Sequence, residues 1–200
     1  MPRLETLLIV AGPSGAGKTH QLWRIAAKRA PWVSRVLEPS VASNLSVVPL
    51  CDLIDGKCDV AHAVVEYELC AYGLRPGGHA LDRGLAQLLD RAEATIVVTL
   101  LARRGTITRR YVRRSLTWYA QRFRCMPLHV LARALSWPRR CLAQRYHPRR
   151  GWLEPGRMDT VYARWFAFCG ERGIARHWVL IDGEGLVPAP EWIGGRCAGL

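Results

Sequence analysis

The sequence has few lysines and no long apolar run. Its 200 residues include three lysines, and no segment approaches the ~20 consecutive apolar residues that span a membrane. The apolar run 6–11 is too short for a secretory signal and has no small-residue cleavage site after it. Seven scattered cysteines include no Cys-x-x-Cys pair, and the six histidines lack metal-ligand spacing. We therefore expect a cytoplasmic protein with reduced thiols, no membrane segment and no structural metal.

Acidic residues are missing from a long central stretch. Between Ala94 and Leu153 the sequence has no Asp or Glu but fourteen arginines, and the whole chain carries a net charge of +13. The excess positive charge therefore lies in this stretch, and the rest of the chain is close to neutral. A basic block without interspersed acids indicates an anionic partner; the alternative is a solvated face without a partner.

A complete phosphate-binding loop stands near the N-terminus. Residues 12–19 read GPSGAGKT and match the pattern G-x-x-x-x-G-K-[ST]. The apolar run 6–11 predicts a buried strand before the loop, and residues 20–30 predict a helix that ends at Pro31. Backbone N–H groups in such a turn converge on a polyphosphate. The residues predicted to bind the phosphates of ATP are Gly12, Pro13, Ser14, Gly15, Ala16, Gly17, Lys18 and Thr19.

Phosphoryl transfer also needs carboxylates, and one strand supplies two. Residues 63–69 predict a strand on which Glu66 and Glu68 point to the same face near the carboxyl end, where ligands bind in open α/β sheets. We expect Lys18 to reach the β- and γ-phosphates, and Thr19 and Glu66 to hold Mg²⁺. Glu68 is then the candidate base, although the sequence fits the reverse assignment of the two glutamates equally well. The alternative is an edge strand with two solvated glutamates.

Other acidic residues fit a functional role less well. Asp52, Asp55 and Asp59 are weaker candidates for binding an acceptor and are better explained as loop and turn residues. Asp182 stands at the end of a predicted strand, where a turn or a helix cap explains it equally well.

The order of the predicted elements indicates the α/β class. Strands alternate with helices, which predicts one domain, residues 1–200, with a parallel sheet and helices on both faces. Segment 34–50 is ambiguous, with short strands conceivable at 35–38 and 46–48. The remaining predicted strands are 95–101 and 177–182, and the remaining predicted helices are 79–92 and 159–169.

These features together resemble the P-loop kinases of the nucleotide-kinase-like group. The resemblance rests on GPSGAGKT, on the order of strands, and on the strand TIVVTLLA that leads into the Arg-rich segment. It implies a P-loop NTPase fold in which residues 103–150 form an Arg-rich helical lid that closes over the phosphates and stabilises the transferring group. By position, it implicates Arg109 and Arg113 as catalytic, and Arg103, Arg104, Arg110 and Arg114 as phosphate-binding.

The spacing of these arginines independently suits an anion. Arg109 with Arg113, and Arg110 with Arg114, form two i,i+4 pairs of like charge on an expected helix. Such pairs destabilise a helix by a few tenths of a kcal/mol each, roughly, unless an anion lies between them.

The sequence therefore predicts an ATP- and Mg²⁺-dependent phosphotransferase. Its acceptor is expected to be a hydroxyl on an anionic molecule: a nucleotide, a sugar phosphate, or a nucleotide within DNA or RNA. One alternative is a nucleic-acid-binding regulatory NTPase without an acceptor. Another is a sulfotransferase of related fold, which the complete GKT with its Thr19 disfavours. A GTPase is disfavoured because no Asn-Lys-x-Asp motif is present.

Overall fold

The computed structural model describes residues 4–13, 15–69, 80–103, 105–107, 109–110, 113 and 157–190. Its strands are β1 (Leu4–Gly12), β2 (Ser46–Val47), β3 (His62–Glu68), β4 (Ala92–Leu101), β5 (Arg176–Ile181) and β6 (Gly185–Pro188). The helices in these ranges include α1 (Lys18–Ala26), α2 (Val33–Val36), α3 (Pro39–Ser43), α4 (Leu50–Ile54), α6 (Ala80–Arg91) and α10 (Arg157–Glu171). Most of the predicted lid, residues 103–150, lies outside the described residues.

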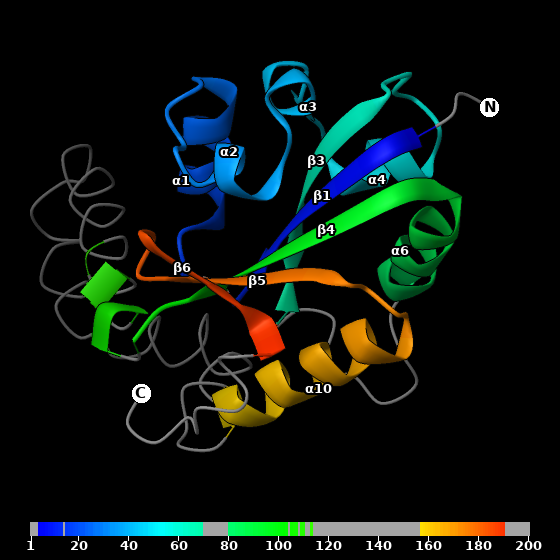
Figure 1. Cartoon of the computed structure of the whole chain (residues 1–200). Helices are drawn as coiled ribbons and strands as arrows, with labels where there is room; N and C mark the ends of the chain where they lie inside the picture. The colour runs from blue at the N-terminus through cyan, green and yellow to red at the C-terminus, as the bar shows by residue number, and fades with distance from the viewer. Residues whose placement is uncertain are drawn as a thin grey trace, which may run out of the picture.

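The strands form one sheet in the order β2-β3-β1-β4-β5-β6 (Figure 1). All neighbouring strands are parallel except β5 and β6, which are antiparallel. The predicted α/β class is therefore confirmed, and the sheet, predicted to be parallel, is mostly parallel with one antiparallel pair. The sequence did not predict β6, which returns along β5 because Asp182 (φ 49°) and Gly183 (φ 88°) reverse the chain in left-handed conformations.

Helices cover both faces of the sheet, as predicted. Alternate residues of β1 point to opposite faces. Leu7 and Ile9 belong to the core cluster with the buried side chains of α4, α6 and α10, whereas Leu8 and Val10 pack with those of α1 and α2 (Figure 1). All four side chains are fully buried. This two-sided burial explains why β1 is a continuous apolar run rather than an alternating one.

Two local predictions needed correction. The helix after the loop ends at Ala26 rather than near residue 30, because Lys28 adopts a left-handed φ of 55° that a helix cannot continue through. Residues 33–36 form α2 and not a short strand, since Val33 and Val36 both turn into the core at helical spacing. The short strand near residue 46 is confirmed as β2. Within the described ranges, no helix has the length and apolar character needed to cross a membrane.

The described helices that follow β1 and β3 in the sequence lie on opposite faces of the sheet. β1 leads into α1 on one face, while the connection after β3 leads to α6 on the other. Adjacent parallel strands whose connections diverge in this way leave a crevice outside their carboxyl ends, and ligands of open α/β sheets bind there. The topology therefore predicts a ligand-binding crevice at the carboxyl ends of β1 and β3.

A buried polar cluster joins β4, β5 and α10. The Trp165 indole N–H donates to Thr99 Oγ1 at 2.8 Å, and Thr99 Oγ1 lies 2.9 Å from His177 Nε2. Because the indole can only donate, the Thr99 hydroxyl proton is available to a neutral His177. Burial lowers the pKa of His177 from 6.5 to about 4, so the imidazole is neutral at pH 7.

We predict that His177 makes the fold less stable in mild acid. In the unfolded chain the imidazole binds a proton below pH 6.5, whereas in the fold it does so only near pH 4, so stability falls as the pH drops between these values. The loss is about 3 kcal/mol from pH 7 to pH 4. The free energy of unfolding, measured with urea at several pH values in this range, should depend less steeply on pH for His177→Gln than for wild type. His20→Gln, a change at an exposed histidine, should keep the wild-type slope. The same dependence of the free energy of unfolding on pH in His177→Gln and wild type would contradict the lowered pKa of His177.

Candidate active site

The carboxyl ends of β1 and β3 bring the phosphate loop and the two glutamates together. In the parallel register, Val10 pairs with Glu66 and Gly12 pairs with Glu68. Val65 and Tyr67 point into the core on the α4, α6 and α10 face, so Glu66 and Glu68 point to the face that α1 covers. β3 pairs with β1 along its length and with β2 at Ala63 and Val64, so it is not the edge strand of the sheet, although β2 does not extend beside Glu66 and Glu68.

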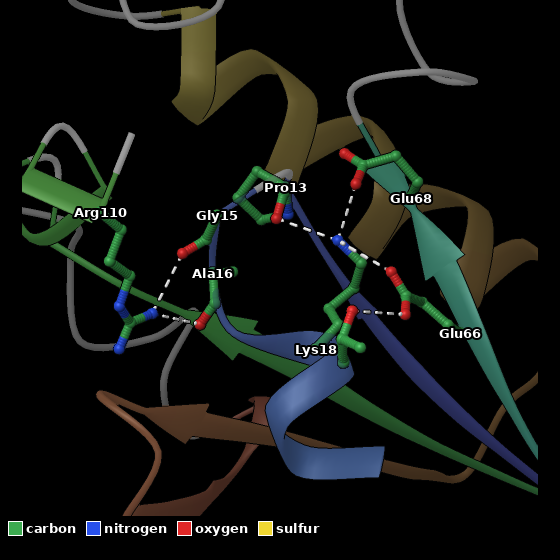
Figure 2. Close-up of polar contacts among 8 residues, drawn as sticks. Pro13, Gly15, Ala16, Lys18, Glu66, Glu68 and Arg110 are labelled. Atoms are coloured by element: carbon green, nitrogen blue, oxygen red, sulfur yellow. Dashed lines mark hydrogen bonds and ion pairs between the residues drawn. The ribbon is translucent and has the colours of Figure 1, made fainter. Parts of the chain in front are cut away.

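The ammonium group of Lys18 lies between the loop and the glutamates (Figure 2). Its Nζ donates to the Pro13 carbonyl at 3.0 Å and to Glu68 Oε2 at 2.7 Å, and lies 3.7 Å from Glu66 Oε1. The side chain is only 3% exposed. A buried ammonium is costly unless charged and polar partners surround it, and these three oxygens serve that purpose.

Glu66 also contacts Thr19, which separates the two glutamates chemically. Thr19 Oγ1 donates to Glu66 Oε2 at 3.2 Å. Glu66 therefore bridges the hydroxyl of Thr19 and the ammonium of Lys18, whereas Glu68 forms a short ion pair with Lys18. This asymmetry favours Glu66 over Glu68 as a partner of Thr19 in binding a cation.

The residues here fit a Mg²⁺ ion bound with a nucleotide. Within the described residues no group of three or more His, Cys, Asp or Glu side chains is arranged to hold a metal ion. Mg²⁺, however, is usually bound by one or two carboxylates together with substrate phosphates and water. The Thr19 hydroxyl and the Glu66 carboxylate, whose oxygens lie 3.2 Å apart, are suited to bind Mg²⁺ in this way.

The loop backbone has the conformation that its glycines permit. Gly15 and Gly17 have φ values of 86° and 103°, which L side chains rarely adopt. A Cβ on Gly12 would lie 3.2 Å from Leu100 Cβ on the neighbouring strand, so the loop also passes close to β4. α1 begins at Lys18 directly after this turn, and the N–H groups of its first turn have no partner within the helix. They are suited to bind an anion. Ser14 lies outside the described residues.

We predict that Gly17→Ala lowers the affinity for ATP, an effect that the loss of stability alone does not produce. The left-handed backbone costs alanine about 1–2 kcal/mol, and the new Cβ would lie 3.1 Å from Arg110 Nη1. Gly56→Ala is a matched control, because Gly56 has a φ of 69° but no atom within 4 Å of an added Cβ. Gly17→Ala should lose at least as much stability as Gly56→Ala in urea unfolding, and calorimetry should show weaker ATP binding only for Gly17→Ala. Equal ATP affinity in the two variants would contradict this reading of the loop.

The predicted arginines occupy different environments. Arg110 Nη1 donates to the carbonyls of Gly15 at 3.0 Å and Ala16 at 2.8 Å (Figure 2). Arg103 Nε lies 3.7 Å from Asp182 Oδ2, an exposed pair worth little energetically. Arg109 and Arg113 are exposed. Arg104 and Arg114 lie outside the described residues.

The weaker carboxylate candidates do not join the loop. Asp55 ends α4 and pairs with Lys57 at 2.7 Å, and Asp59 precedes the amino end of β3, which is the opposite end from Glu68. Asp52 lies in the first turn of α4. Asp182 occupies the turn between β5 and β6.

Two contacts in the site could not be read from the sequence. The Pro13 carbonyl accepts a hydrogen bond from Lys18, and Arg110 donates to the backbone of the loop rather than to a side chain. Backbone carbonyls carry no sequence signal, so only the glycine-rich pattern itself pointed to this region. Comparison with models of known protein families and with curated protein sequences finds no match to this chain.

Proposed function

We propose that this protein is an ATP- and Mg²⁺-dependent phosphotransferase of the P-loop kinase type. It would transfer the γ-phosphate to a hydroxyl of an anionic acceptor. One observation carries the proposal: Lys18 and Thr19 of the loop meet Glu66 and Glu68 at the carboxyl ends of adjacent parallel strands. Donor binding and acid–base chemistry need these residue types at one point.

The loop would hold the donor. N–H groups of the loop and of the first turn of α1 bind the β- and γ-phosphates, and Lys18 exchanges its contact with Glu68 for phosphate oxygens. Thr19 and Glu66 would hold Mg²⁺, which neutralises negative charge on the phosphates. The Lys18 ammonium adds a second positive charge in a position that water barely reaches, where it is worth more than in solvent.

Glu68 would act on the acceptor. It is the last residue of β3, and its side chain is 23% exposed, so solvent reaches part of its carboxylate at the carboxyl end of the strand. Once Lys18 turns to phosphate, the carboxylate of Glu68 can accept the proton of that hydroxyl. The proposal therefore assigns the metal to Glu66 and the base to Glu68.

The Arg-rich segment supports an anionic acceptor and a lid. It starts at the carboxyl end of β4, which neighbours β1, and Arg110 near its start contacts the loop. The P-loop NTPase fold and a lid formed by residues 103–150 are part of this proposal. Fourteen arginines without an acid exceed what the phosphates of one ATP need, which favours an acceptor that carries phosphate itself.

The proposal is tested by measuring ADP release with and without candidate acceptors. A kinase should form ADP rapidly only when its acceptor is present, among nucleosides, nucleotides, sugar phosphates and DNA or RNA. Slow ADP formation that no acceptor accelerates would instead indicate the regulatory NTPase. Absence of ATP binding would contradict both, and would leave the sulfotransferase alternative to be tested with a sulfonate donor.

Salt dependence should then distinguish the acceptor classes. If the acceptor is a polynucleotide that contacts six or more arginines, its affinity should fall by roughly 10³-fold between 50 and 200 mM salt. A small nucleotide or sugar phosphate releases few counterions, and its KM should change far less over this range. The measurement is the KM of the acceptor at several salt concentrations and saturating ATP.

A further inference from the structure

The side chain of Arg110 hydrogen-bonds to the phosphate loop on the side opposite the glutamates (Figure 2). One nitrogen, Nη1, donates to the carbonyls of Gly15 and Ala16 at 3.0 and 2.8 Å. The same nitrogen would lie 3.1 Å from a Cβ at Gly17, so the guanidinium packs directly against the tightest part of the turn. Arg110 therefore hydrogen-bonds two successive residues of the loop, Gly15 and Ala16, and leaves little room for a side chain at the third, Gly17.

These contacts fix two peptide groups whose N–H groups face the other way. In a trans peptide the N–H points opposite to the C=O, so a donor on the Ala16 carbonyl directs the Gly17 N–H away from Arg110. In the same way, a donor on the Gly15 carbonyl orients the Ala16 N–H, which donates to the Pro13 carbonyl at 3.1 Å. That carbonyl in turn accepts from Lys18 Nζ. A positive charge on the carbonyl side also polarises each peptide and strengthens its N–H as a donor.

The segment that carries Arg110 is anchored near the loop. Ile107, three residues earlier, is fully buried in the core cluster that also contains Ala16 and Leu22. The Ile107 N–H donates to the Arg103 carbonyl at 3.1 Å, which forms a helical turn after β4. Packing thus holds Ile107 three residues before Arg110, whose side chain reaches the loop.

We infer that Arg110 is a positioning residue, which holds the phosphate loop in its binding conformation from the carbonyl side. The nucleotide part of this inference rests on the proposed function, whereas the effect on the loop does not. The resemblance to kinases implies instead that Arg110 binds a phosphate directly. The two roles differ first in the nucleotide-free protein, where only a clamp on the loop affects the loop's amide groups. They differ also in which ligands they affect: a clamp acts equally on every nucleotide that the loop binds, and a contact to the γ-phosphate acts on ATP alone.

The test compares Arg110→Gln with wild type and with Arg35→Gln, which removes an exposed arginine from α2. In the nucleotide-free protein, amide hydrogen exchange measured by NMR should become several-fold faster at residues 15–18 in Arg110→Gln only. The Kd values of ATP and ADP should both rise about tenfold, by the same factor, as loss of a charged hydrogen-bond donor implies. Because Arg110 is exposed, the midpoint of thermal unfolding should stay close to wild type.

Other results would overturn the inference. Unchanged exchange at residues 15–18 would show that Arg110 does not hold the loop. Weaker binding of ATP with unchanged binding of ADP would assign Arg110 to the γ-phosphate instead. If wild type bound neither nucleotide, the proposed function would fail, and amide exchange would still decide whether Arg110 clamps the loop.

Discussion

Replacing Lys18 by alanine is expected to reduce ATP turnover by more than about a thousandfold while the protein stays folded. The change removes the positive charge that faces the β- and γ-phosphates, and no neighbouring cation among the described residues contacts both glutamates in its place. The fold should survive because Glu66 and Glu68 are 35% and 23% exposed, so water can solvate both carboxylates once the ammonium is gone.

A second lysine provides the control for this experiment. Lys57 pairs with Asp55 at 2.7 Å, the same distance as Lys18 to Glu68, but it is exposed and lies far along the chain from the loop. Lys57→Ala should keep wild-type turnover, and circular dichroism should show that both variants are folded. If Lys18→Ala turned over ATP at the wild-type rate, the loop would not be the donor site.

Exchanging either glutamate for glutamine is expected to impair the reaction in a different way. In Glu66→Gln the Mg²⁺ concentration for half-maximal rate should rise by roughly 10–100-fold, because Glu66 shares the ion with Thr19. In Glu68→Gln the Mg²⁺ requirement should stay unchanged and kcat should fall by roughly 10²–10⁴-fold, as expected for loss of a general base. Affinity for ATP should change little in Glu68→Gln. Steady-state kinetics over a range of Mg²⁺ concentrations measures all of these effects.

Glu171→Gln serves as the matched control, since Glu171 is exposed at the end of α10. It should behave as wild type in both the Mg²⁺ requirement and kcat. A reversal of the two phenotypes would exchange the roles of Glu66 and Glu68. Normal turnover in both variants would mean that the acidic groups of the reaction lie elsewhere.

Much of this site follows from local sequence. The loop is recognisable because only glycines allow the φ values of Gly15 and Gly17, and because a lysine and a hydroxyl must follow at fixed spacing. Glu66 and Glu68 were predicted to share a face because strand residues alternate, and both contact Lys18. The α/β class followed from the alternation of predicted strands and helices along the chain.

The remainder depends on contacts between distant parts of the chain. Nothing in the sequence states that β3 lies beside β1, because the strand order results from packing of the whole sheet. A shift of two residues in the pairing of β1 with β3 would place either Glu66 beside Gly12 or Glu68 beside Val10, so their roles could not be separated beforehand. An arginine can donate to a phosphate or to a backbone carbonyl, and for this reason the contact of Arg110 with the loop was not foreseen.

The most direct test of the account is to follow the γ-phosphate itself. ATP labelled at this position is incubated with Mg²⁺, the protein and a panel of nucleosides, nucleotides, sugar phosphates and nucleic acids, and the labelled products are separated. We predict that the label appears on an anionic acceptor with wild type and that transfer is lost with Lys18→Ala and with Glu68→Gln. Label that appears only in inorganic phosphate, or transfer that persists in both variants, would contradict the assignment of this site as a phosphotransferase.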